Sequence, residues 1–164
     1  MRLRYVLLLV LASASFSAQA QTPAGTIKRM QGESQIVSTS GARAAEVGGA
    51  IHAGERVVTG KSAVGLTLHD GTQMAVGPNA VVTVQNYQFD PTTRQGSLMI
   101  DVARGAMRMV SGLIARHDPA AVKVNTPTAT IGIRGTDFIV DVDEPAGARW
   151  CASYRRCCSG QRRR

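Results

Sequence analysis

Apolar residues recur at every second position in many short segments of the chain. These segments lie at 64–68, 74–76, 82–84, 98–102, 107–109 and 122–124. Turn signals such as Asp70-Gly71, Gly77-Pro78-Asn79 and Asp90-Pro91 stand between them. Alternation with a period of two predicts strands with one buried face, and strand centres roughly 8 to 12 residues apart are typical of all-β domains.

The same pattern excludes a parallel sheet with helical crossovers, because no segment shows a helical stripe with caps. The segment 111–121 is expected to be a loop. Two all-β architectures remain. Very short strands with glycine-rich corners favour a β-solenoid, a β-helix-like winding in which each strand stacks on the next coil. A jelly-roll β-sandwich is the alternative.

A change of phase occurs within residues 126–142. Apolar residues occupy odd positions at 131 and 133, and even positions from 138 to 142. A phase change in a period of two requires an extra residue, so we expect a bulge or a tight corner at Arg134-Gly135-Thr136. Glycine adopts the backbone of such a corner at low cost, which gives Gly135 a structural role first.

The first 20 residues have the features of an export signal. Arg2 and Arg4 precede an apolar run of 12 residues from Tyr5 to Phe16, and Ala18-Gln19-Ala20 is a small-x-small cleavage site. A membrane-spanning helix requires roughly 20 residues, so the run is too short for a membrane anchor. We expect cleavage after Ala20 and a soluble product in the periplasm.

The net charge of +8 comes from the two ends of the chain. Residues 1–20 and 148–164 carry 8 of the 19 basic residues and no acid, and the other 11 basic residues match all 11 acids in 21–147. A neutral body lacks the electrostatic footprint of a nucleic-acid-binding protein. The segment 148–164 also holds every cysteine and the only tryptophan. It is expected to be either a basic tail or the product of a shifted reading frame.

No set of residues has the spacing of a catalytic or metal-binding site. His52, His69 and His117 lie far apart, and His69 and Asp70 are neighbours that point to opposite faces of a strand. The chain lacks Gly-x-Ser-x-Gly and Ser-x-x-Lys motifs, and the sequence "GKS" at 60–62 lacks the upstream glycine of a P-loop. We therefore expect a non-enzymatic protein that uses no cofactor or metal.

Several polar side chains have both a structural and a binding interpretation. Arg134 either ties down neighbouring carbonyls or a carboxylate such as Asp137, or contacts a partner, and Asp70 is expected to cap its turn. Met107 and Met109 face one way and are expected in the core.

A solvent-facing set that fits a sugar or a partner strand contains Thr67, Thr83, Gln85, Thr128 and Thr130. An exposed edge strand is the expected docking element for a partner.

Three phrases stand in order: "GERVVTGKSAVGLTLHDGT", "LMIDVARGAM" and "VKVNTPTATIGIRGTDFIVDV". Together they resemble the FecR-type domain of bacterial envelope proteins over about residues 25–143, with core motifs in 54–143. The matching positions are Gly54, Glu55, Thr59, Gly60, Asp70, Gly71, Thr72, Gly105, Thr126, Pro127, Ala129, Arg134, Gly135, Thr136 and Phe138.

The resemblance implies a non-catalytic binding and signalling role. The best-known members of this family sense a TonB-dependent outer-membrane receptor through a periplasmic part and control a sigma factor through a cytoplasmic segment. Only Met1 to Arg4 precede the apolar run in this sequence, so we expect no cytoplasmic segment that could hold a sigma factor. We therefore expect a stand-alone exported domain, of residues 21–147, whose motif residues are structural or bind an envelope protein. The alternative partner is a cell-wall glycan such as peptidoglycan.

Overall fold

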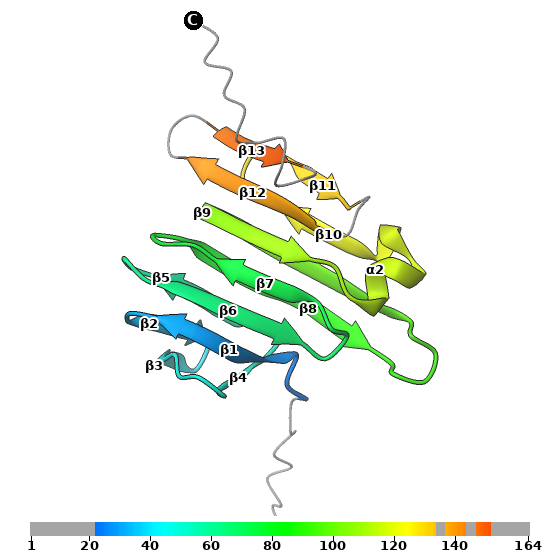
Figure 1. Cartoon of the computed structure of the whole chain (residues 1–164), viewed down its shortest axis with the longest axis horizontal. Coiled ribbons are helices and arrows are strands. Elements are labelled where there is room, and N and C mark those ends of the chain that lie inside the picture. Colours follow the sequence, from blue (N-terminus) through cyan, green and yellow to red (C-terminus); the bar gives the residue numbers. More distant parts are fainter. Residues whose placement is uncertain (1–21, 134–136, 144–146, 152–164) are drawn as a thin grey trace, which may run out of the picture.

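The computed structural model describes residues 22–133, 137–143 and 147–151 (Figure 1). Within these residues the chain forms short strands joined by tight turns, together with a short helical segment. The strands are β1 (Gly25–Gln31), β2 (Ser34–Ser38), β3 (Gly41–Ala44), β4 (Ala50–Ile51), β5 (Arg56–Thr59), β6 (Ala63–Leu68), β7 (Gln73–Val76), β8 (Val81–Phe89), β9 (Gly96–Val110), β10 (Val122–Asn125), β11 (Thr130–Gly132), β12 (Asp137–Asp143) and β13 (Gly147–Cys151). The all-β class predicted from the alternation is confirmed.

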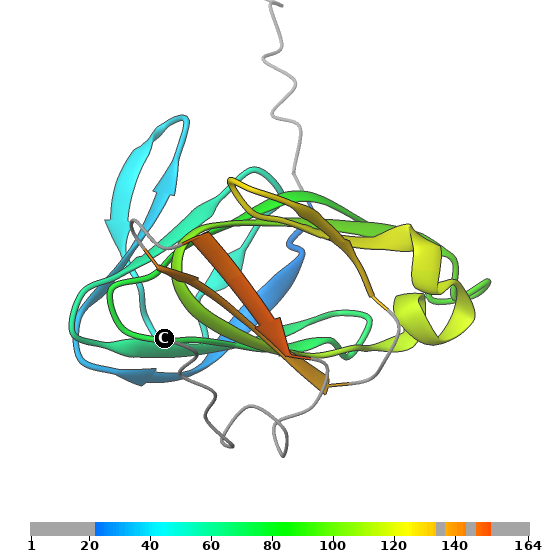
Figure 2. The ribbon, with the colours of Figure 1, turned by 90° about the horizontal axis from the view of Figure 1, so that it is seen from above.

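Two layers of one curled sheet face each other across the core. One layer contains, in order of pairing, β4, β1, β6, β7, the second half of β9, β12 and β13. The other contains β3, β2, β5, β8, the first half of β9, β10 and β11. Figure 2 shows the two layers curving towards each other, so the sheet forms a half-barrel that is continuous through β9.

The strand pairing does not confirm a solenoid winding. In the described part of the chain every strand pair is antiparallel except β10 with β9. A parallel β-helix stacks each coil on the next in parallel register. The alternating short segments were therefore enough to predict an all-β fold. The order and direction of the strands in the sheet depend on antiparallel pairing between distant segments.

The longest strand, β9, belongs to both layers. Its buried side chains are even-numbered up to Val102 and odd-numbered from Met107 onward. Gly105, with φ of +79°, lies at this change and is the first residue that pairs with β12, opposite Val142. The sequence predicted two strands separated by Ala103-Arg104-Gly105. The structure joins them because Gly105 redirects the backbone without ending the strand.

Aliphatic and methionine side chains fill the core. Met107 and Met109 are 0% exposed, which confirms that both point inward. The largest side chains that are fully buried are Ile27, Ile36, Ile51, Leu66, Met74, Leu98, Ile100, Met107, Met109 and Ile114. Phe138 is buried, whereas Tyr87 and Phe89 are only partly buried at the margin of the core. The core of the described residues therefore depends mainly on branched and linear aliphatic groups.

The segment expected to be a loop contains α2 (Leu113–His117) and the 3-10 helix η1 (Pro119–Ala121), which is a correction. The N-cap residue of α2 is Gly112, which has no side chain that could cap the helix. The helix has only five residues, too few for an apolar stripe that sequence analysis could detect. Asp118 caps η1 by accepting a backbone N–H at 2.9 Å. In the part of the chain described here, no helix is both long enough and apolar enough to cross a membrane.

Some predicted features fall outside the described residues. The cleavage positions Ala18 and Ala20, and the triplet Arg134-Gly135-Thr136, are among them. The triplet stands between β11 of one layer and β12 of the other, and a corner there stays a prediction. β13 includes residues 148–151, which the composition assigned to the tail, and residues 152–164 lie outside the description.

Candidate functional site

Glu55 connects the edge strand β3 to the body. It is 7% exposed and follows Gly54, whose φ of +85° opens the turn between β4 and β5. Arg43 Nη2 donates to the two carboxylate oxygens at 3.0 and 2.9 Å and to the Ala50 carbonyl at 2.7 Å. The backbone N–H of His52 donates to the same carboxylate at 2.8 Å. These donors offset the desolvation of the carboxylate, so Glu55 anchors the β2–β3 hairpin.

Thr59 and Gly60 hold the turn between β7 and β8. Thr59 Oγ1 donates to the Gly77 carbonyl at 2.6 Å and accepts the Ala80 N–H at 2.9 Å. The Gly60 carbonyl accepts the Asn79 N–H at 2.6 Å. This threonine hydroxyl is therefore satisfied both as a donor and as an acceptor within the turn.

Gly105 of β9 lies against the same turn. A Cβ at this position would lie 2.6 Å from the Cα of Ala80, closer than real Cβ contacts occur. Next to it, Arg104 Nε donates to the Asn79 carbonyl at 3.1 Å. Two of the three motif phrases thus contact the same turn, at the point where β9 passes from one layer to the other.

Asp70 is a buried turn cap and is 1% exposed. Its carboxylate accepts the backbone N–H of Thr72 at 3.1 Å and the Thr72 hydroxyl at 2.7 Å, around Gly71 with φ of +81°. The same turn holds the start of α2, because Thr72 Oγ1 accepts the Gly112 N–H at 3.0 Å and the Asp70 carbonyl accepts the Leu113 N–H at 2.8 Å. The predicted cap is confirmed.

The last motif phrase forms a small turn between β10 and β11. Thr126 N–H donates to the Ala129 carbonyl at 2.8 Å, and Thr126 Oγ1 accepts the Ala129 N–H at 3.1 Å. Pro127 lies exposed within this turn, and Phe138 on β12 packs in the core. The described motif residues therefore make turns and core contacts, and a partner-binding role for any of them stays a prediction.

Thr83 does not belong to the solvent-facing set in which the sequence placed it. It is 7% exposed, and its Oγ1 accepts a hydrogen bond from Arg56 Nε at 3.3 Å. Val82 and Val84 on either side of it are 0% exposed, so Thr83 points to the outer face of the strand, where the Arg56 side chain covers it. Alternation alone could not predict this cover, because it depends on the pairing of Arg56 on β5 with Thr83 on β8.

The three histidines lie in separate parts of the described structure. His52 Nδ1 is 3.5 Å from a Glu55 oxygen, whereas His69 and His117 are exposed. His69 is exposed and Asp70 is buried, but both lie in the turn after β6 and not on a strand, which corrects the prediction. Among the described residues, no group of three potential ligands is close enough together to hold a metal ion.

β3 is an open edge of the sheet. It pairs with β2 alone among the described strands, and all four of its residues are exposed. The Ala45 N–H donates to the Ser34 carbonyl at 2.9 Å. Because successive N–H groups of a strand point to opposite sides, the N–H groups of Ala42 and Ala44 face the open edge. Figure 2 shows the β2–β3 hairpin standing away from the two layers.

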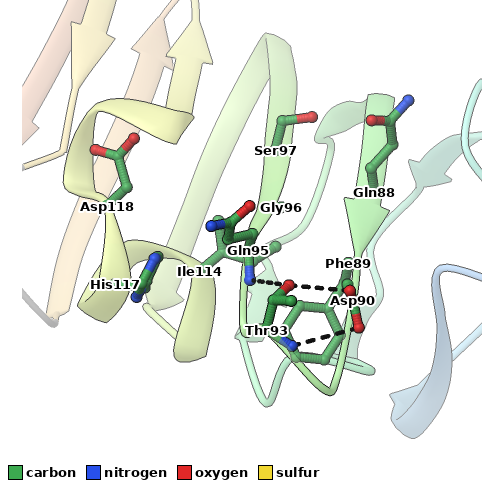
Figure 3. Close-up of a pocket in the computed structure, with 10 residues that line it drawn as sticks. All are labelled: Gln88, Phe89, Asp90, Thr93, Gln95, Gly96, Ser97, Ile114, His117 and Asp118. Carbon is green, nitrogen blue, oxygen red and sulfur yellow. Dashed lines mark hydrogen bonds between the residues drawn. The ribbon is translucent and has the colours of Figure 1, made fainter.

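A cavity of about 650 Å³ lies between the β8–β9 hairpin and α2 (Figure 3). Its volume is within the roughly 300–1,000 Å³ of most ligand sites. The β8–β9 hairpin contributes Gln88, Phe89 and Ser97, and α2 contributes Ile114 and His117. With Asp90 and Asp118, the lining is a mixture of amide, hydroxyl, imidazole, carboxylate and apolar groups.

A second cavity, of about 570 Å³, shares Gln88 and Phe89 with the first. Pro23 and Tyr87 also line it. Tyr87 Oη accepts the Asp70 N–H at 2.9 Å, and this hydrogen bond holds the ring against the turn at Asp70-Gly71-Thr72. Burial, followed by the charge of Asp70, raises the pKa of Tyr87 to about 12, so its hydroxyl stays protonated at neutral pH.

A family model described as FecR protein matches residues 55–150, more than half of the chain. The chain belongs to the FecR family. Proteins of this family take part in envelope signalling with TonB-dependent receptors, and the FecR domain is periplasmic. The match includes the turns at Thr59 and Asp70 and the whole of β9. No curated protein and no solved structure matches the chain.

Sequence reasoning found the FecR motif residues and missed two features of the site. Arg43 was not singled out, because its contact with Glu55 depends on how the hairpin folds back. The paired cavities were also missed. The available signal was the presence of Tyr87 and Phe89 in a chain that is only 4% aromatic.

Proposed function

We propose that the mature chain is an exported, non-catalytic FecR domain that binds another protein of the cell envelope, in signalling related to TonB-dependent receptors. The FecR match over residues 55–150 carries this proposal. A leader cleaved after Ala20 delivers the protein to the periplasm. The functional body is then residues 21–147 together with the rest of β13, which pairs with β12 as far as Cys151, and the basic tail follows this strand.

Support for a non-catalytic role comes from the hydrogen bonds of the polar motif residues. The side chains of Glu55, Thr59 and Asp70 are each committed to a turn or a hairpin. A general base or nucleophile needs an acceptor or hydroxyl that is free to face a substrate. Because these side chains stabilise turns and a hairpin, they fit better a role in which the domain presents a rigid surface to a binding partner.

The open edge of β3 is the proposed docking element, and its occupant is an extended segment of the envelope partner protein. Ala42 and Ala44 present N–H groups outward, and their small side chains leave room for another strand. β3 has no lysine or proline of the kind that blocks edge-to-edge pairing. The contact between Arg43 and Glu55 holds β3 in place before the partner binds. The loss of conformational entropy of β3 on binding is therefore smaller.

Ala44→Pro tests this docking element, with Ala44→Ser as its matched control. Proline removes the outward N–H and keeps the pairing with β2, whereas serine retains the N–H. We expect Ala44→Pro to reduce co-purification of the outer-membrane receptor from an envelope extract by at least roughly tenfold, the equivalent of one or two main-chain hydrogen bonds. Far-ultraviolet circular dichroism checks that both variants fold.

Two results argue against parts of this proposal. Equal recovery of the receptor by the two variants rules out docking at β3 and leaves the receptor as partner. Co-sedimentation of the protein with peptidoglycan, with no receptor recovered, favours the alternative function as a cell-wall glycan-binding module.

A further inference from the structure

Tyr87 and Phe89 differ in position from the core side chains around them. They lie two residues apart on β8, so their rings project from the same face of the strand. Both are partly buried and both line cavities at the surface. Phe89 lines both cavities, as does its neighbour Gln88. An aromatic face that remains open beside polar groups is a common component of ligand sites.

The polar groups around these rings include free amides. The side chains of Gln88 and Gln95 have no hydrogen-bond partner among the described residues. Each amide offers a donor and an acceptor, as a ligand hydroxyl group also does. Thr93 and Ser97 add hydroxyl groups to the same wall, and Figure 3 shows them on the hairpin that faces α2.

The charge of the groove disfavours an anionic ligand. No lysine or arginine is among the described residues that line either cavity. Asp90 and Asp118 do line the first cavity, and hydrogen bonds from the backbone of Thr92 and the hydroxyl of Thr93 keep the pKa of Asp90 below its usual value. A ligand rich in uncharged hydroxyl groups fits these surroundings.

We propose that the two cavities form one groove that binds an uncharged saccharide chain. The apolar face of a sugar ring packs against Phe89, and Gln95 bonds its hydroxyl groups. Gln88 precedes Phe89 on β8, so its side chain projects from the opposite face of the strand, as Figure 3 shows. A peptide strand would instead be recognised through main-chain pairing, whereas side-chain amides, hydroxyls and aromatic rings line this groove. The groove is separate from the β3 edge and needs no protein partner.

The test is a titration of the isotope-labelled mature chain, followed by NMR, with two probes: a tetramer of N-acetylglucosamine and a tetramer of glucose. We expect at least one probe to shift backbone signals of residues 87–97 and 114–118. The variant Gln95→Ala should weaken that binding by roughly fivefold to tenfold, because one amide contact is lost. Gln35→Ala, an exposed glutamine on β2, should leave it unchanged.

Phe89→Leu provides a second, independent variant. Leucine keeps the apolar contact with the core and removes the aromatic face, so folding is preserved and binding should weaken at least several-fold. The proposal is overturned if neither tetramer shifts any signal at about 10 mM, a concentration that saturates even a site with a Kd of about 1 mM. Shifts confined to other surfaces, or an affinity that Gln95→Ala leaves unchanged, also overturn it.

This outcome is distinguishable from that of the β3 proposal. Ala44→Pro should bind the saccharide like the unaltered chain, and Gln95→Ala should still recover the receptor. An extended peptide that shifts residues 87–97 where neither saccharide does would assign the groove to a protein ligand and overturn the saccharide proposal.

Discussion

Gly105 packs so closely on Ala80 that a Cβ at position 105 would lie 2.6 Å from the Ala80 Cα. The contact joins the corner of β9 to the turn between β7 and β8, at the point where β9 leaves one layer and enters the other. Both residues are therefore part of the junction that makes the two layers one sheet.

Gly105→Ala should destabilise the protein strongly. The change places a side chain at φ of +79° and forces it against backbone atoms. We expect the free energy of unfolding to fall by about 2–4 kcal/mol, combining the cost of a left-handed residue with that of steric overlap. Urea denaturation measures the difference.

Gly60→Ala is the matched control, because a Cβ at this second motif glycine meets nothing within 4 Å. Its effect should stay within about 0.5 kcal/mol. If both variants lost stability equally, steric contact with Ala80 would not be the reason for the glycine at 105.

Thr59→Val should also destabilise the protein, for a different reason. The isosteric change removes the hydroxyl that donates to Gly77 and accepts from Ala80, and leaves both backbone groups without that partner. We expect a loss of about 1–3 kcal/mol in thermal unfolding. Thr59→Ser keeps the hydroxyl and should retain most of the stability, so equal losses in the two variants would contradict the role of the hydrogen bonds.

Tyr87 should make the protein sensitive to alkali. Its pKa rises from 10.0 to about 12 in the folded state, so the unfolded chain loses the phenolic proton at lower pH than the folded one. This contribution to stability is fully present below pH 10.0, and is lost as the pH rises towards about 12. Tyrosinate absorbance should report one late-titrating tyrosine, and Tyr87→Phe should remove both the signal and the alkaline slope. An unchanged slope in that variant would assign the sensitivity elsewhere.

Arg43 and Glu55 should be energetically coupled. Arg43 is 44% exposed at its side chain and Glu55 only 10%, so screening by solvent limits the contact. A double-mutant cycle of Arg43→Met and Glu55→Gln is expected to give a coupling of about 1 kcal/mol. Hydrogen exchange in β2 should speed up in both single variants. Strict additivity of the two changes would show that the ion pair does not hold the hairpin.

Local chemistry in the sequence was enough to predict the all-β class and many of the turns. Asp70 caps its turn through atoms only two residues away, and Met107 and Met109 point inward because alternation places them on one face. Such features depend on neighbouring residues, so the order of side chains determines them directly. The ordered turn motifs also sufficed to indicate the FecR family.

The tertiary structure decided which distant residues meet. The contact of Gly105 with Ala80, the bond of Arg43 to Glu55, and the groove between Gln88 and α2 all join segments whose spacing carries no signal of proximity. These contacts depend on the register in which the strands pair and on the passage of β9 between the two layers. A shift of one residue in that register would move each side chain to the other face of the sheet. Long-range pairing, rather than local propensity, therefore produced both the open edge and the groove.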